Sequence, residues 1–118
     1  MAQTITVLGT QNSVPGQLTP IAADGVTVED ISTITPGSEV YTLSPTGIAT
    51  VSPTSGTEGA FVVTRISGQS GTVTLMYTAV NTAGTTITNT NGVPDTILFQ
   101  APPTGVAASL ASTFGTPS

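Results

Sequence analysis

Short β-branched segments with a two-residue period recur along this chain, and they limit its fold more than any other sequence feature. Apolar and polar residues alternate through them, as in strands with one buried face. Turn clusters such as VPGQ, TPGS and SPTSGTEG separate them at intervals of about eight to twelve residues. No window has a convincing helical period, so we expect almost no helix. The expected strands cover residues 4–8, 25–31, 38–43, 47–51, 60–66, 71–80, 84–88 and 95–100.

This spacing of strands and turns predicts an all-β fold, namely a single antiparallel β-sandwich or barrel, of which an immunoglobulin-like sandwich is one form. The length of 118 residues fits one domain. We assign residues 1–100 to the β-domain. Residues 101–118 begin with Ala-Pro-Pro and carry no charged side chain, so we expect them to form an extended C-terminal arm.

Residues 60–80 predict the clearest hairpin, with SGQSG as its loop. In the second arm of this hairpin Val73, Leu75 and Tyr77 share one face, and we expect them in the core. Arg65 is the only basic residue of the chain. We place it on the outer face, where its long stem would cover a cross-strand neighbour.

The scarcity of charge excludes several classes of function. Only 6% of the residues are charged, and the formal net charge is −5. One Arg and no Lys cannot form the basic surface that nucleic acid or an anionic membrane requires, so we expect neither partner. The start, MAQTITVLGT, lacks the regions of a secretory signal. Without His, Cys or Lys most catalytic bases and nucleophiles are missing, so we expect no enzymatic activity and no cofactor.

Two sets of side chains are candidates for a site. Asp24, Glu29 and Asp30 offer oxygen ligands of the kind Ca²⁺ prefers, but their spacing matches no known calcium loop. A turn aspartate with two solvated charges explains them more simply, and we expect no metal. Leu110 and Phe114 are the only large apolar residues of the arm. They indicate either a frayed tail or a tether that inserts into a neighbouring molecule.

The lack of charge also favours association. Charged side chains normally protect strand edges from pairing with other chains, and here Pro, Gly, Ser and Thr stand in their place. We therefore expect a homo-oligomer or a protein bound to partners for much of its life. A hydroxyl-rich β-protein without an export signal fits a virion protein that is assembled in a host cytoplasm.

Residues 52–80, SPTSGTEGAFVVTRISGQSGTVTLMYTAV, resemble the middle of a bacterial or phage immunoglobulin-like module. The whole chain, poor in charge and rich in Thr, Ala and Gly, is similar to the small capsid decoration (cement) proteins of tailed phages. That resemblance implies a shell protein, often trimeric, whose arms tie capsomers together. Its partners would be the major capsid protein or other virion subunits.

From these observations we expect a structural virion protein that decorates and stabilises a phage capsid through β-edge and arm contacts. Two alternatives stay open. One is an immunoglobulin-like adhesion or carbohydrate-binding module of a surface protein or tail fibre. The other is a tail-tube or fibre-forming subunit.

Overall fold

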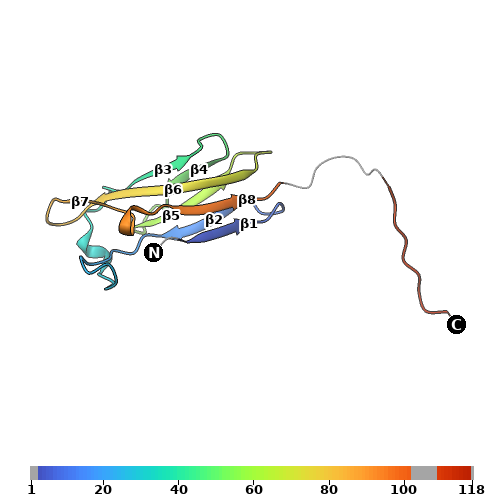
Figure 1. The fold of residues 1–118 in the computed structure, drawn as a ribbon, viewed down its shortest axis with the longest axis horizontal. Coiled ribbons are helices and arrows are strands. Elements are labelled where there is room, and N and C mark those ends of the chain that lie inside the picture. The colour runs from blue at the N-terminus through green and yellow to red at the C-terminus, as the bar shows by residue number, and fades with distance from the viewer. Residues whose placement is uncertain (1–2, 102–108, 118) are drawn as a thin grey trace.

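The structure is a computed structural model that describes residues 3–101 and 109–117 (Figure 1). It is built from strands and two three-residue 3₁₀ helices, which confirms the all-β prediction. No helix in these ranges is long and apolar enough to cross a membrane. The strands are β1 (Thr4–Val7), β2 (Ser13–Gln17), β3 (Val40–Ser44), β4 (Ala49–Pro53), β5 (Ala60–Arg65), β6 (Gly71–Val80), β7 (Thr86–Thr88) and β8 (Asp95–Phe99). The 3₁₀ helices are η1 (Ile31–Thr33) and η2 (Thr90–Gly92).

The strands form two sheets. The larger has the order β1-β8-β6-β3, with β7 also paired to β6, and the smaller has the order β2-β5-β4. The pairing of the described strands leaves both sheets open, so the alternative of one closed barrel is not found. All pairs are antiparallel except β1 and β8, which run parallel. The purely antiparallel prediction is therefore wrong at this pair. The first and last strands have no short turn between them that would force an antiparallel return.

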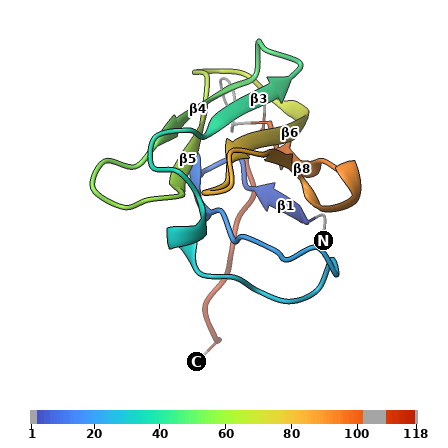
Figure 2. The same ribbon diagram turned by 90° about the vertical axis from the view of Figure 1, so that its left-hand side faces the viewer.

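One apolar core takes side chains from both sheets. Figure 2 shows the strands of these sheets from the left-hand side of Figure 1. Val73 and Leu75 are fully buried in the core, as predicted, and Tyr77 is half-buried against it. The rings of Tyr41 on β3 and Phe61 on β5 lie 5.0 Å apart between their centroids, so they join the two sheets directly. The buried members of the cluster are Val7, Leu43, Ala49, Phe61, Val63, Val73, Leu75, Ile97 and Phe99.

The predicted hairpin of residues 60–80 is wrong, because β5 and β6 belong to different sheets. The SGQSG segment carries the chain from one sheet to the other. Phe61 and Val63 on β5 face the same core as Val73 and Leu75 on β6. Strands of different sheets can bury these rows against each other, which two neighbours in one sheet cannot do.

Residues 25–31 do not form the strand that their alternation predicts. Val26 and Val28 are 79% and 64% exposed, and the only pairing here is an isolated bridge between Ile21 and Val28. Alternation alone does not make a strand when no neighbouring strand or core is within reach of the segment.

Strand β2 was missed because it contains Pro15 and Gly16, which indicate a turn. Both are tolerated because β2 is an edge strand of the smaller sheet. Gly16 also has a packing role. A Cβ atom at this position would lie 2.2 Å from the nearest ring carbon of Phe61, so only glycine lets the ring pack against this strand.

Arg65 is buried, with only 6% of its surface exposed, so its predicted place on the outer face is wrong. The alternation of β5 puts Arg65 on the same side as Phe61 and Val63, which face the core. The guanidinium carbon Cζ of Arg65 lies 5.3 Å from the centroid of the Phe99 ring, within the range of a cation–π contact.

Four backbone carbonyls accept hydrogen bonds from the Arg65 guanidinium. They come from the β1–β2 connection, the β5–β6 connection and the residue after β8, so one side chain joins three segments at this end of the domain. Nη1 donates to Gln69 O at 2.8 Å and to Gln100 O at 2.6 Å, and Nη2 donates to Leu8 O and Gln11 O, both at 3.0 Å.

We expect Arg65→Met to lower the free energy of unfolding by at least about 3 kcal/mol, because four carbonyls lose their donor while the apolar stem is kept. Urea unfolding followed by circular dichroism measures the change. Thr64→Met, at the neighbouring exposed position, is the control and should change stability by less than about 0.5 kcal/mol. Equal stability of the two variants would show that the guanidinium does not hold these connections together.

We expect Gly16→Ala to destabilise the domain by about 1–3 kcal/mol, because the new methyl group overlaps the Phe61 ring. Gly47→Ala is the matched control, since a Cβ atom at Gly47 meets nothing within 4 Å. The same urea experiment compares them. If Gly16→Ala proves as mild as the control, the ring does not pack against this strand as described.

Candidate functional site

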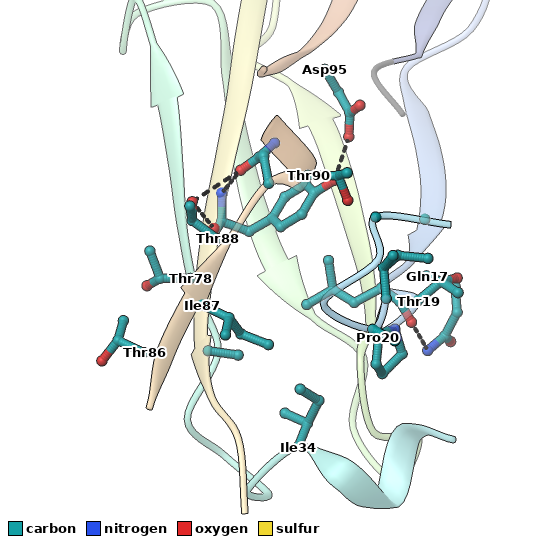
Figure 3. A pocket seen from close by; sticks show the side chains of 18 of the residues that line it. Gln17, Thr19, Pro20, Ile34, Thr78, Thr86, Ile87, Thr88, Thr90 and Asp95 are labelled. Carbon is teal, nitrogen blue, oxygen red and sulfur yellow. Dashed lines mark hydrogen bonds between the residues drawn. The ribbon is translucent and has the colours of Figure 1, made fainter. Parts of the chain in front are cut away.

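A groove of about 660 Å³ opens at the end of the domain where β7 lies (Figure 3). One wall is formed by β6, β7 and the residues after them, and the other by the end of β2 and the segment that follows it. Ile87 and Ile34 point into the opening, and Pro20 lies across from Ile87. The groove therefore has apolar side chains from both sheets and from the loop between them.

The groove is almost uncharged. Among the described residues that line it, Asp95 is the only one with a charged side chain. The Asp95 carboxylate accepts hydrogen bonds from the Gln3 N–H at 2.9 Å and from the Tyr77 hydroxyl at 3.1 Å. Burial, and then the charge and hydrogen bond of Asp95, raise the pKa of Tyr77 to about 12. Tyr77 thus stays a neutral donor at ordinary pH, and the groove suits an uncharged, largely apolar ligand.

β7 and β8 pair with the same side of β6, and the Asn89 side chain fills the gap between them. It is 3% exposed, its Oδ1 accepts from the Tyr77 N–H at 2.9 Å, and its Nδ2 donates to the Leu75 carbonyl at 3.3 Å. These are bonds that a neighbouring strand would otherwise make. The Asn89 amide therefore replaces a strand residue at the point where β7 ends and η2 begins.

The predicted acidic residues lie in the segment before β3, where Asp24 and Asp30 each accept hydrogen bonds within their own turn. The Asp24 carboxylate accepts from the backbone N–H and the hydroxyl of Thr27, and these bonds lower its pKa to about 2. The Asp30 carboxylate accepts from the Ser32 N–H at 2.9 Å at the start of η1, which lowers the pKa of Asp30. Glu29 is exposed. Within residues 3–101 and 109–117 no three Asp, Glu, His or Cys residues gather where they would hold a metal ion.

Glu39 and Glu58 form a pair of carboxylates near the start of β3, which the sequence analysis did not predict. Glu39 precedes β3 and Glu58 lies between β4 and β5, so the fold brings together residues next to strands of different sheets. Burial, followed by a hydrogen bond and the charge of Glu58, raises the pKa of Glu39. Glu58 also accepts from the Gly37 N–H at 3.4 Å. No spacing in the sequence marks this pair.

The predicted interface residues Leu110 and Phe114 are 96% and 93% exposed, so neither side chain packs against the domain. Residues 109–117 form no strand or helix. The remainder of the predicted arm beyond Ala101, residues 102–108 and 118, lies outside the described residues.

Comparison with protein-family models, with curated proteins and with solved structures finds no match. The groove, the carboxylate pair and the two exposed apolar side chains of the tail are the features from which a function has to be inferred.

Glu39→Gln should make stability less dependent on pH. The raised pKa means that the folded state holds the Glu39 proton more tightly than the unfolded state. The free energy of unfolding therefore falls as pH rises from the ordinary value of 4.5 through the folded pKa, and Gln removes this loss. We expect a gain below about 1 kcal/mol at pH 7, because solvent screens this partly exposed pair.

Urea unfolding at several pH values between about 4 and 8, on either side of the ordinary glutamate pKa, measures this effect. Glu29→Gln is the control, since the Glu29 side chain is exposed. Parallel stability curves for the two variants would contradict an unfavourable charge at Glu39.

Proposed function

We propose that this chain is a non-enzymatic structural component of a phage virion, which decorates and stabilises a capsid through its strand edges and its C-terminal arm. The observation that carries the proposal is the exposure of Leu110 and Phe114 on an uncharged tail. Burying each of these side chains against a neighbour would contribute about 1.5–3 kcal/mol. Two such anchors suit a contact arm better than a solvated end.

The strand edges support the same role. The edge strands β1, β2, β3 and β4, and the short β7 beside β6, contain no charged side chain. Pro15 in β2 and Pro53 in β4 hinder the addition of another strand to the smaller sheet. β1, β3 and β7 contain no proline, so the open edges of the larger sheet are the ones suited to pairing with a neighbour.

We interpret the domain as an immunoglobulin-like β-sandwich that serves as a rigid support. In that fold strands B, E and D lie in one sheet, and C, F and G lie in the other. The orders β2-β5-β4 and β8-β6-β3 match this arrangement when β7, with three residues, is left out. The missing Cys and Trp separate the chain from antibody-type domains.

The capsid as partner is inferred from the resemblance in composition to decoration proteins. Hydroxyls and apolar side chains dominate the surface, and the single cation is buried. Attachment by salt bridges from this chain's own cations is therefore not available. Backbone pairing and apolar anchors remain, and both suit a permanent place on a shell.

The test is whether the protein is a part of particles. In density-purified particles from the organism that encodes it, we expect the chain at a fixed ratio to the main shell protein. The double variant Leu110→Ser/Phe114→Ser should keep its urea midpoint but load onto particles at least about tenfold more weakly, because both anchors are lost. Val26→Thr, an exposed position on the domain, is the control. Particles without the protein, or unchanged loading of the double variant, would refute the proposal.

The groove favours one alternative, an immunoglobulin-like adhesion or carbohydrate-binding module. This alternative expects a monomer that binds glycans in the groove. Titration of a glycan panel, followed by the chemical shifts of Tyr77 and Ile87, would distinguish it from the virion proposal. Aromatic platforms for sugar rings are few there, since Phe61 and Tyr77 are the only aromatic residues among the described lining.

A further inference from the structure

We propose that the groove receives residues 109–117 of a second copy of this chain, which add to β7 as an extra strand. The inference rests on the proposed role of the tail as a contact arm and names its partner. It also gives the contact a direction, from the tail of one copy to the groove of the next.

The hydrogen bonds of Val80 show which backbone groups of β7 face outward. Val80 lies opposite Thr86 in the register of β6 and β7. Its N–H donates to the Ser38 hydroxyl at 3.0 Å and its carbonyl accepts from the Thr35 N–H at 2.7 Å, both on the β3 side of β6. Val80 and Thr86 are therefore a non-hydrogen-bonded pair. The backbone N–H and C=O of Thr86, and by the same alternation those of Thr88, point away from β6.

The groove occupies the place where a further strand would lie. β8 pairs with β6 only over Gly71–Leu75, and β1 lies beyond β8, so neither extends the sheet beside β7. Thr86, Ile87 and Thr88 line the groove along this edge. In Figure 3 Ile87 points into the opening, whereas Thr86 lies on the other side of the strand. An added strand would find outward backbone groups beside an apolar depression.

The tail has the pattern that such a site requires. In an extended chain Leu110 and Phe114 are four residues apart, so they point to the same side, about 13 Å from each other. Ser112 lies between them on that side. No residue of 109–116 is Pro, so every backbone N–H needed for pairing is present. The segment carries no charge, and the groove has only Asp95, which is already hydrogen-bonded.

The position of the tail favours a second copy over the chain's own groove. β8 ends at Phe99 opposite Gly71, whereas β7 pairs with the other end of β6 at Val80. These ends of β6 are about 30 Å apart at the rise of a β-strand. Figure 1 shows β7 at one end of the domain and the end of β8 at the other. A copy placed end to end brings its groove to the end of the domain where β8 finishes, and the contact repeats into rings or open chains.

Two complementary variants test the pairing in the full chain. Leu110→Ser/Phe114→Ser keeps the groove but lacks the anchors, and Ile87→Lys keeps the tail but puts a charge in the groove. We expect wild-type protein to form oligomers and each variant alone to be monomeric by analytical ultracentrifugation. Their mixture should form a one-to-one dimer, because each supplies what the other lacks. Ile66→Thr, at an exposed position on the β5–β6 connection and outside the groove, is the control and should associate like wild type.

Thr86→Pro is a second groove variant in case Ile87→Lys does not fold. Proline is tolerated on an edge strand where the N–H faces outward, and it blocks an added strand. A synthetic peptide of residues 109–117 should bind the Leu110→Ser/Phe114→Ser chain and slow the amide exchange of Thr86. Its Phe114→Ser form should bind at least about tenfold more weakly.

A monomeric mixture, oligomers of Ile87→Lys like those of wild type, or a peptide without effect on Thr86 would each overturn the inference. These experiments contain no capsid, so they fail separately from the virion proposal. Particles without the protein together with a one-to-one dimer would refute the virion role and leave the tail-to-groove contact standing.

Discussion

The guanidinium of Arg65 holds one end of the domain together, and both the attachment of the two sheets there and the lack of a basic side chain on the surface depend on its burial. A buried cation loses its hydration. Here the place of water is taken by four carbonyl dipoles and the face of the Phe99 ring, and no carboxylate of the described residues is involved. Those carbonyls belong to connections of both sheets and to the residue after β8. The sheets and the start of the tail therefore share one point of attachment. Because the only basic side chain is used inside, the exterior offers acids, hydroxyls, amides and apolar groups but no basic side chain.

The local pattern of the strands was predictable, and their partners were not. On β5 the expected exposure of Arg65 was wrong, because its face, with Phe61 and Val63, is buried. On β6 alternation identified the buried row because it depends only on which face is apolar. It could not show that the two strands lie in different sheets, since the short Gly-containing SGQSG segment fits a crossing as well as a hairpin. Pro15 and Gly16 hid β2, because their use depends on an edge position and on the Phe61 ring, both of which are tertiary facts.

The features of the candidate site show the same division. Asp24 and Asp30 act within a few residues of themselves, so a reading as turn residues was within reach of the sequence. The exposed Leu110 and Phe114 stood out by composition in an uncharged tail. The groove and the Glu39–Glu58 pair could not be found this way, because each joins segments of both sheets that are distant along the chain. Only the strand order brings them together.

Trypsin can cut this chain at one bond only, and because Arg65 is buried the rate of cutting reports how often the domain opens. This protease cuts after Lys and Arg, and the chain has one such residue. In the folded domain the bond after Arg65 is protected, so digestion follows the population of opened molecules when opening is fast relative to cutting. The products are two fragments, residues 1–65 and 66–118, and the cut severs one of the connections between the two sheets. Each opened molecule is therefore cut once, between β5 and β6, and the amount of the two fragments measures how many molecules have opened.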